Sequence, residues 1–383
     1  MNVLFISHSL LMSGGANRSM LQLILELRQN HHVKPIVLAP FGKIPHSDKG
    51  LVNECRDNNI TVIRSVIPWF VHNKVFCHRI KYLLLFFYYP ILICILKKYN
   101  IQLIHSNASV FDLGAKLSKS LGVPHIWHFR EFGTENSTFK PVRNYKYITK
   151  LYAQADKIIA ISHAIKHSYE TMVDKEKVVV IYNGIDVARY NICANHTNNI
   201  VHFVIVGVVT PHKNQMEAIK AAAVLLRDGI TQFHINIIGQ ENTDYKTLIS
   251  SFIRENGLTN YVTFWGIRDD VPTFLSKMDV GLMLSKSEAF GRVTIEYMFQ
   301  NLAVIASDTG ANPELINNNK TGLLYHYGNC NDLAEKMKMI ILDKSLLFHL
   351  SSQGRINARK EFCSTKNSDN IYRIYEEVIK SNI

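Results

Sequence analysis

The sequence has no clustered cysteines. Its cysteines are scattered, without a CxxC pair or the spacing of a metal-binding motif. A disulfide framework and a structural zinc site are therefore both disfavoured, and we expect free thiols in a reducing compartment. The six positions are Cys55, Cys77, Cys94, Cys193, Cys330 and Cys363.

Common nucleotide-binding and targeting signatures are also missing. The turn SHSLLMSGGANRS is not GxGxxG, and no acidic residue ends a second strand at the ribose-binding distance, which counts against an NAD dehydrogenase. The chain has no GxxxxGKS/T P-loop, and Asp269-Asp270 is not a DxD metal motif. The N-terminal stretch has no basic n-region, so we expect a buried strand rather than a signal peptide, and a cytoplasmic protein.

Acidic residues are absent from 58–111, and the net charge of +12 is unevenly distributed. Residues 1–190 carry 24 Lys and Arg against 12 Asp and Glu, whereas residues 191–383 carry 19 against 19. The N-terminal half is therefore expected to face an anionic partner, or at least to tolerate one.

The apolar segment 80–100 lies within this basic region. Its apolar core, Tyr82 to Leu96, has 15 residues and a proline, short of the roughly 20 needed to span a bilayer, so no transmembrane helix is expected. The mixture of apolar, aromatic and basic side chains favours contact with anionic lipid headgroups; a core helix with solvated basic ends is the alternative. The basic residues are Arg64, Lys74, Arg79, Lys81, Lys97 and Lys98.

Short β-rich apolar runs alternate with helical patterns, which predicts an α/β protein with parallel sheets. The polar segment 191–199 is the best boundary between two Rossmann-like domains, 1–190 and 200–360, and 361–383 is expected to be a helix that returns to the N-terminal domain. The expected strands are 3–7, 35–39, 61–64, 101–106, 125–129, 157–162 and 178–183, then 201–209, 233–239, 262–266, 280–285, 303–307 and 322–327.

Ligands of such sheets bind at the carboxyl ends of strands, and three glycine loops are found there. Gly14-Gly15 precedes a helical pattern, whose free N–H groups would point toward a ligand. Gly207 is followed by Lys213, which can reach a phosphate. For each of these two loops a plain structural turn or solvated lysine is the alternative.

The third loop follows Gly266. Backbone groups of Ile267 and Arg268 could read a base edge there, and Asp270 is expected to cap the helix that begins near Pro272.

The stretch SEAFGRVTIE places Gly291 where a loop gives way to a helix. Glu288 then lies in the loop and Glu296 in the second helical turn, so the two carboxylates should contact different parts of one ligand whose anionic middle lies over the helix N-terminus. Carboxylates accept hydrogen bonds from sugar hydroxyls, and N–H groups bind a diphosphate. A nucleotide-sugar has this order of groups.

SEAFGRVTIEYM closely resembles the E-x7-E signature of the retaining GT-B glycosyltransferases of family 4. The GG turn, VIYNGID (180–186), the Lys213 loop and ASDTGANPELI with TGLLYHYGNCNDLAEKM follow in the family's order, so the resemblance covers nearly the whole chain. It implies a GT-B fold, with two Rossmann-like domains facing a central cleft. The donor would bind the C-terminal domain, and the acceptor the N-terminal domain.

The resemblance also implies roles for single residues. Glu288 would contact donor-sugar hydroxyls and Glu296 the ribose, and Lys213 would neutralise the diphosphate. Val208 replaces an arginine that the family often carries, so Lys213 would neutralise the diphosphate alone or with help from Arg292 or Arg268. Gly15, Gly207, Ile267 and Arg268 complete the expected donor site, with backbone N–H groups of Phe290, Gly291 and Arg292 on the diphosphate.

In WHFREFG, His128 resembles the family histidine that meets the donor sugar, and we count it with Glu288 and Lys213 as catalytic. Arg130 and Glu131, together with Gly14, are expected on the acceptor side. Ser162 and 183–186 match further family positions and are expected to shape turns.

The resemblance thus implies retaining transfer of a sugar from a nucleotide diphosphate sugar, UDP-sugar in preference to GDP-sugar, to a lipid-linked or saccharide acceptor. Neither a cofactor nor a metal is expected, and the place of action would be the inner face of the cell membrane, in surface polysaccharide or lipopolysaccharide synthesis. Two alternatives stay open: a GT-B nucleotide-sugar 2-epimerase, and a basic nucleic-acid-binding protein, although no nucleic-acid motif is present.

Overall fold

A computed structural model describes residues 1–12, 15–44, 49–72, 74–132, 142–190 and 199–382. The chain forms two compact units. The N-terminal unit comprises Met1–Gly184 and Ser364–Ile383, and the C-terminal unit comprises Ile185–Cys363. The first unit therefore ends earlier than the sequence suggests, because Ile185 pairs with Cys363 and Tyr190 packs on Phe299. Most of the expected linker, 191–199, lies outside the described residues.

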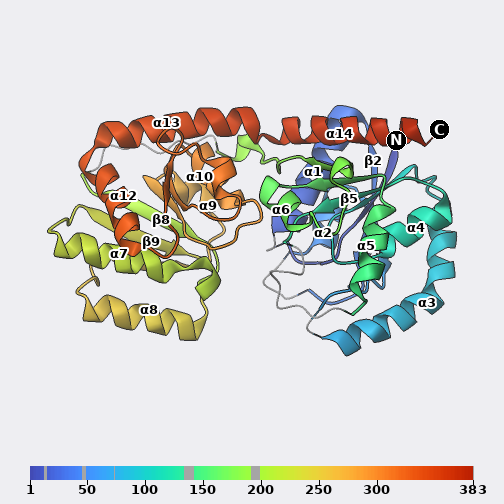
Figure 1. Ribbon diagram of the computed structural model, residues 1–383, viewed down its shortest axis with the longest axis horizontal. Coiled ribbons are helices and arrows are strands. Elements are labelled where there is room, and N and C mark those ends of the chain that lie inside the picture. Colours follow the sequence, from blue (N-terminus) through green and yellow to red (C-terminus); the bar gives the residue numbers. More distant parts are fainter. Residues whose placement is uncertain (13–14, 45–48, 73, 133–141, 191–198, 383) are drawn as a thin grey trace. The chain divides into compact units, whose positions relative to one another are not determined.

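The N-terminal unit is a seven-stranded parallel sheet covered by helices (Figure 1). Its strand order is β3-β2-β1-β4-β5-β6-β7. The elements are β1 (Asn2–Ile6), α1 (Gly15–His31), β2 (Lys34–Pro40), α2 (Leu51–Asp57), β3 (Thr61–Ser65), α3 (Val75–Lys97), β4 (Leu103–Ser106), α4 (Leu113–Leu121), β5 (His125–Phe129), α5 (Tyr145–Ala153), β6 (Lys157–Ala160), α6 (His163–Ser168), β7 (Val178–Val180) and α14 (Ser364–Ser381).

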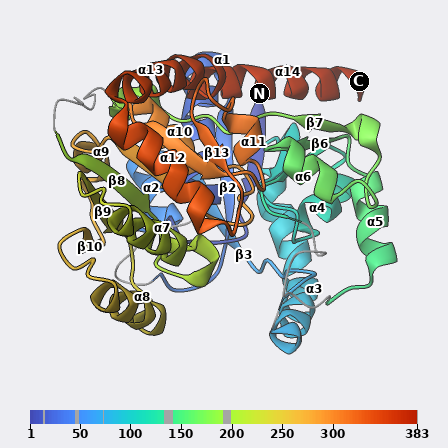
Figure 2. The ribbon, with the colours of Figure 1, turned by 60° about the vertical axis from the view of Figure 1, so that its left-hand side comes forward.

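The C-terminal unit has a six-stranded parallel sheet of order β10-β9-β8-β11-β12-β13 (Figure 2). Short 3₁₀ turns at Val187–Tyr190 and Pro211–Lys213 supplement its strands and helices. Its elements are β8 (Val201–Val206), α7 (Gln215–Arg227), β9 (Phe233–Ile238), α8 (Thr243–Glu255), β10 (Val262–Gly266), α9 (Val271–Leu275), β11 (Val280–Met283), α10 (Arg292–Phe299), β12 (Ala303–Ser307), α11 (Asn312–Leu315), β13 (Leu323–Tyr325), α12 (Cys330–Leu342) and α13 (Lys344–Glu361).

The expected α/β class with two parallel sheets is confirmed. The strands are nearly continuous in apolar residues because helices bury both faces of a parallel sheet. In each unit the strand order reverses beside the first strand, at β1/β4 and at β8/β11. Loops on the two sides of such a point diverge and leave room for a ligand, which places the loops after β1, β4, β8 and β11 where a site is expected.

The C-terminal helix α14 belongs to the N-terminal unit and packs beside α1 (Figure 1). Its inward residues Ile371, Tyr375 and Val378 join the same core as Met20 and Leu27 of α1. The last helix of the chain is thereby part of the first domain.

Helix α3 is longer than the apolar segment predicts. It extends over 23 residues, Val75–Lys97, and by length and composition alone it is long enough to cross a membrane. The apolar core, Tyr82 to Leu96, underestimates the helix because residues 75–81 before it, which mix apolar, polar and basic side chains, and Lys97 after it are also helical. Nor is it a core helix, since only His78, Leu85, Leu92 and Leu96 are buried.

Candidate functional site

Lys213 and Glu288 form an ion pair at the carboxyl ends of β8 and β11. The Lys213 Nζ donates a short hydrogen bond to the Glu288 Oε1, although 75 residues separate the two in the sequence. Both side chains are largely buried, with exposed fractions of 29% and 15%. A charge-assisted bond in such partly dry surroundings fixes both groups in position.

The backbone of Glu288 is held by the loop that follows β12. The Ala311 N–H donates to the Glu288 carbonyl over 2.9 Å. Gly310 has a φ of +60°, and a Cβ on it would lie 2.6 Å from the Glu288 nitrogen. Only glycine permits this approach. The segment ASDTGANPELI thus contributes to the site by supporting the Glu288 loop.

Lys213 is positioned by the turn before α7. Asn214 adopts the left-handed conformation, and its side-chain amide donates to the Glu217 carboxylate in the first turn of the helix. The Tyr325 hydroxyl donates to the same carboxylate over 2.8 Å. Glycine is also required at Gly239, whose added Cβ would lie 2.0 Å from the Gly207 carbonyl oxygen. The loops after β8 and β9 are therefore closely packed beneath Lys213.

Glu296 lies one turn into α10 and pairs with Arg292. The Arg292 Nε donates to the Glu296 Oε1 over 2.9 Å, with both side chains mostly buried. Its neighbour Tyr297 anchors the helix, because the hydroxyl accepts a 2.8 Å bond from the Val206 N–H at the end of β8. Gly281 makes room for that ring, since a Cβ there would lie 2.1 Å from it.

Gly291 separates the two glutamates in the predicted way. It stands at the N-cap of α10 with φ 84° and ψ 51°, a left-handed conformation that favours glycine. Phe290 before it is buried and packs edge-on against Phe362. The N-terminal end of α10, where the helix dipole favours an anion, therefore lies between Glu288 and Glu296 along the chain.

In the N-terminal unit, His128 lies on β5 and is fully buried. Its Nδ1 lies 3.2 Å from the Arg130 Nη2 and 3.1 Å from the His105 Nε2. The His105 Nδ1 in turn lies 2.6 Å from the Tyr375 hydroxyl of α14. Two histidines, an arginine and a tyrosine thus form one buried network.

The network determines which nitrogen of His128 carries hydrogen. Arginine can only donate, so the His128 Nδ1 accepts and its hydrogen is on Nε2. Burial first, and the Arg130 charge second, lower the pKa of His128 well below 6.5, so the ring is neutral. The buried Nε2 has no hydrogen-bond partner among the described residues. His128 is therefore a neutral donor.

Arg130 and Glu131 are both engaged locally. The Arg130 Nε donates to the Asn107 Oδ1 and its Nη1 to the Asn183 Oδ1, each over 2.5 Å. The Glu131 Oε1 accepts from the Ser109 N–H over 2.6 Å. Burial raises the pKa of Glu131, although the hydrogen bonds from Ser109 oppose the shift. Both side chains organise the carboxyl ends of β4 and β5.

The fold agrees closely with that of solved glycosyltransferases. HepE of Anabaena, crystallised with UDP, superposes with a TM-score of 0.82 at 21% identity, over 98% of this chain and 100% of that one. The model named Glycosyltransferase Family 4 matches residues 13–189, and Glycosyl transferases group 1 matches residues 194–360. A glycosyltransferase of Methanocaldococcus jannaschii, itself uncharacterised, is 30% identical over 291 residues, 74% of this chain and 78% of the relative. The chain belongs to the GT-B glycosyltransferases.

A relative with a stated reaction is the UDP-Gal:alpha-D-GlcNAc-diphosphoundecaprenol alpha-1,3-galactosyltransferase of Escherichia coli. It is 23% identical over 304 residues, which cover 74% of this glycosyltransferase and 78% of the relative.

Not every expected donor residue of the glycosyltransferase joins these pairs. The Arg268 guanidinium donates to both Asp270 oxygens, over 2.8 and 2.7 Å, and lies over the Trp265 and Phe274 rings. Asp270 occupies the N-cap position of α9 without a side-chain capping bond, so the expectation that it caps the helix is wrong. The Arg268 guanidinium, two residues earlier, holds its carboxylate instead. The Ile267 side chain is exposed.

The glycine loop after β1 is described only in part. Gly14 lies outside the described residues. Gly15 is the first residue of α1, and no atom lies within 4 Å of the place where its Cβ would be. Asn17 of α1 holds the loop, because its side chain bonds the Ser9 and Leu11 carbonyls, each over 2.9 Å.

Sequence reasoning missed several residues that support the candidate residues of each unit. They include His105, Asn107 and Tyr375 in the N-terminal unit and Gly310 in the C-terminal unit. A strand-end signal like that of His128 is present for His105, in IQLIHS, and for Asn107 just after it. No local pattern predicts Tyr375, because it reaches His105 from 270 residues away. Among the described residues there is no group of three or more His, Cys, Asp or Glu side chains that could hold a metal ion.

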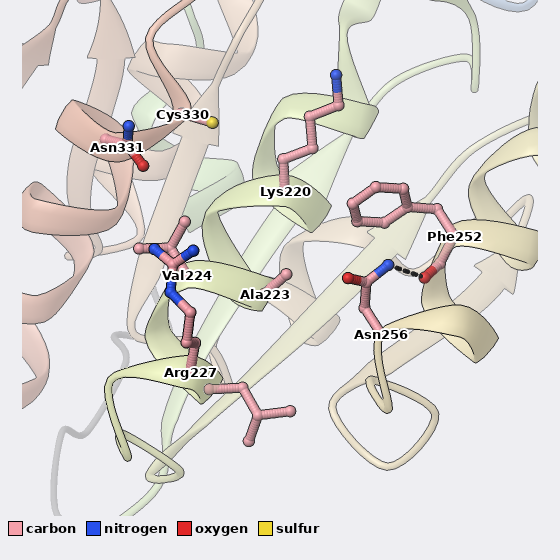
Figure 3. Close-up of a pocket in the computed structure, with 9 residues that line it drawn as sticks. Lys220, Ala223, Val224, Arg227, Phe252, Asn256, Cys330 and Asn331 are labelled. Atoms are coloured by element: carbon pink, nitrogen blue, oxygen red, sulfur yellow. Dashed lines mark hydrogen bonds between the residues drawn. The ribbon is translucent and has the colours of Figure 1, made fainter.

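A hollow of about 560 Å³ lies elsewhere in the C-terminal unit, between α7, α8 and the start of α12 (Figure 3). Lys220 and Arg227 of α7 line it, with Phe252 of α8 and Cys330 of α12. None of the predicted site residues is among its lining residues, so it is separate from the Glu288 loop.

Proposed function

We propose that this glycosyltransferase moves a sugar from a nucleotide diphosphate sugar, preferably a UDP-sugar, to an acceptor hydroxyl with the anomeric configuration retained. The observation that carries the proposal is the position of Glu288 and Glu296 on either side of the α10 N-terminus, with Lys213 bonded to Glu288. This arrangement matches a ligand with hydroxyls at both ends and an anion between them. The UDP complex of HepE supports UDP as the nucleotide.

Each group then has a distinct task. Glu288 accepts hydrogen bonds from the donor sugar and Glu296 from the ribose. The diphosphate lies at the N-terminal end of α10, at the backbone of Phe290, Gly291 and Arg292. An ammonium group has three donors, so Lys213 can keep its bond to Glu288 and donate to a phosphate oxygen as well. Because Arg268 is bonded to Asp270, phosphate neutralisation falls mainly to Lys213.

The transfer needs no protein nucleophile in this scheme. The acceptor oxygen forms a bond to the anomeric carbon from the face that the diphosphate leaves, the bond between that carbon and the phosphate oxygen breaks, and the acceptor proton passes to the departing diphosphate. The protein contributes position and charge: the α10 dipole and Lys213 stabilise the negative charge that develops on the leaving group. His128, as a neutral donor, meets a hydroxyl of the donor sugar.

The acceptor class is a lipid-linked or saccharide hydroxyl, with Arg130 and Glu131 on the acceptor side, and the pathway is assembly of a bacterial surface polysaccharide or lipopolysaccharide. The diphosphoundecaprenol acceptor of the Escherichia coli relative supports this class. Transfer is proposed to be independent of metal, because Lys213 and the α10 N-terminus supply positive charge next to the diphosphate, as a metal ion otherwise would.

The test combines a donor screen with product analysis. A panel of UDP- and GDP-sugars is screened for thermal stabilisation, where a bound donor raises the melting temperature by mass action. The stabilising donor is incubated with acceptors in chelator, and the anomeric configuration of the product is read by NMR. Retained configuration and full activity in chelator are expected. Inversion, or loss of activity in chelator that Mg²⁺ restores, would refute the mechanism, and an epimer formed from donor alone would indicate a nucleotide-sugar epimerase instead.

A further inference from the structure

Helix α3 presents two sharply different sides. Its buried residues His78, Leu85 and Leu92 recur every seven positions, which is the pattern of a helix packed along one stripe. The opposite side carries large apolar side chains that remain in solvent, with exposed fractions of 75% for Phe76, 72% for Phe86 and 68% for Phe87. The full exposed set is Phe76, Ile80, Leu83, Leu84, Phe86, Phe87 and Ile91.

Positive charge surrounds this apolar side. The basic residues at both ends of the helix and near its start are exposed, and no Asp or Glu occurs anywhere in 58–111 to balance them. A contiguous apolar surface of this kind, bordered by one sign of charge, marks an interaction site rather than an ordinary surface. The basic residues are Lys74, Arg79, Lys81, Lys97 and Lys98.

The packed side fastens α3 to its own unit at several points. The His78 Nδ1 accepts from the Trp69 N–H over 2.8 Å, and the Tyr88 hydroxyl donates to the Arg64 carbonyl over 3.2 Å. The Tyr82 ring lies under two cations, with Arg143 at 4.3 Å and Lys116 at 4.9 Å from its centre. Spanning a bilayer would bring these groups into hydrocarbon, so the helix can offer only its outer side to lipid.

We propose that α3 lies flat on an anionic membrane, with its outer apolar side among the acyl chains and its basic residues at the lipid headgroups. Aromatic and aliphatic residues on one side with Lys and Arg at its borders are what an interfacial helix requires. A second copy of the chain fits less well, because two such helices face to face would oppose their cations without a single carboxylate in 58–111 to pair with them. Docking through α3 is independent of the proposed sugar transfer.

The test is co-sedimentation of the full-length protein with vesicles in low salt. Vesicles of phosphatidylcholine with roughly 30% phosphatidylglycerol should bind it, whereas phosphatidylcholine alone should bind several-fold less, because each Lys or Arg near an anionic surface contributes about fivefold. Phe86→Asp and Phe87→Asp should each weaken binding at least about tenfold, since an aromatic side chain that would enter the acyl chains is replaced by a charge. Phe348→Asp, at an exposed phenylalanine of α13, is the matched control and should bind as the wild type.

A charge pair of variants separates the headgroup contribution. Arg79→Glu should reduce binding to anionic vesicles and leave the weak binding to phosphatidylcholine unchanged, while Lys320→Glu, on an exposed loop of the C-terminal unit, should change neither. Stabilisation by UDP should persist in every variant, which distinguishes loss of docking from loss of folding or of the donor site.

Three results would overturn the proposal: no sedimentation of the wild type, equal binding of Phe86→Asp and wild type, or a wild-type dimer that Phe86→Asp converts to monomer. So would membrane material that resists an alkaline carbonate wash and needs detergent, because that behaviour indicates a spanning helix.

Discussion

The two units share one architecture but place different chemistry at the carboxyl ends of their strands. In the C-terminal unit the candidate residues form opposite-charge pairs, Lys213 with Glu288 on the loops and Arg292 with Glu296 in the first turns of α10. In the N-terminal unit they form a fully buried network of neutral rings around Arg130, in which His105 and His128 are hydrogen-bonded. Charge pairs are suited to recognising a polar, anionic sugar donor. Buried, hydrogen-bonded imidazoles are suited to holding a single N–H group, that of His128, in one orientation. The same fold therefore carries charged pairs in one unit and a neutral buried network in the other.

The largest expected difference between the two units is in how their stability responds to acid. Burial lowers the pKa of His125 to about 3, and those of His105 and His128 well below 6.5. Below pH 6.5 these histidines take up protons in the unfolded chain but not in the folded one, so the free energy of unfolding decreases as the pH falls. At pH 5 each histidine lowers it by roughly 2 kcal/mol. In the C-terminal unit, burial lowers the pKa of one described histidine, His234.

Hydrogen exchange followed by mass spectrometry at pH 7 and pH 5 measures this difference. Protection factors, which correct for the slower intrinsic amide exchange at pH 5, should fall through the N-terminal sheet at pH 5 and stay high in the C-terminal sheet. Equal loss of protection in both units would contradict the comparison.

Glu288→Ala tests the charge-pair unit. Transfer should fall by about 100-fold or more, because a group that contacts the reacting sugar is removed from a preorganised site. UDP affinity by calorimetry should stay near the wild-type value, since Lys213 and α10 remain. Asp228→Ala removes a carboxylate beside Lys338, just after the last residue of α7, and serves as the control. Wild-type turnover in Glu288→Ala would exclude the assignment.

Glu296→Ala should act on binding instead of on turnover. Loss of a hydrogen bond to a charged group is worth roughly 1.5 to 3 kcal/mol, so UDP affinity should drop about 10- to 100-fold. At saturating donor, turnover should be much less affected than in Glu288→Ala. Calorimetric titration with UDP and with inorganic diphosphate, which lacks the nucleoside, distinguishes a nucleoside contact from a phosphate contact. Unchanged UDP affinity would remove Glu296 from the donor site.

Tyr375→Phe probes the neutral network and has the smallest expected effect. Removing the hydroxyl frees the His105 Nδ1 and loosens the orientation of His128, so turnover should fall by roughly three- to tenfold. UDP affinity and melting temperature should stay close to wild type. Nitrogen NMR of labelled histidine should show His128 with hydrogen on Nε2 in both proteins, because Arg130 still donates to its Nδ1, and should show a mixture of tautomers for His105 in the variant alone.

Tyr372→Phe is the matched control on the same helix, because Tyr372 stacks on His31 at 4.1 Å and not on His105. If Tyr372→Phe and Tyr375→Phe lower turnover equally, the hydroxyl of Tyr375 has no specific positioning role.

Much of the fold follows from local pattern. Near-continuous apolar strands alternating with helical periods predict parallel sheets, and the structure places a strand in every predicted apolar run. Gly291 likewise predicts where α10 begins, because the left-handed conformation at this N-cap favours glycine. The unit boundary and the Asp270 cap could not be predicted, because each depends on a competing contact, Ile185 with Cys363 and Asp270 with Arg268.

The length of α3 shows a different kind of limit. Hydropathy identifies the apolar core, but it does not say which of its residues pack inward. Exposure of Phe76 and Phe86 depends on which side of the helix meets α4 and the rest of the unit. Once the helix is packed, the apolar residues that remain exposed define the surface that we propose for lipid.

The sequence by itself determined the strand and helix pattern, the uneven charge, the resemblance to family 4 and the spacing of Glu288 and Glu296 around Gly291. These properties are short-range, because they depend on period, composition and the conformation of single residues. Only the tertiary structure decided that Lys213 bonds to Glu288, that Gly310 supports the Glu288 backbone and that Tyr375 orients His128 through His105. Contacts across 75 and 270 residues arise from packing of the whole unit, which no local pattern encodes.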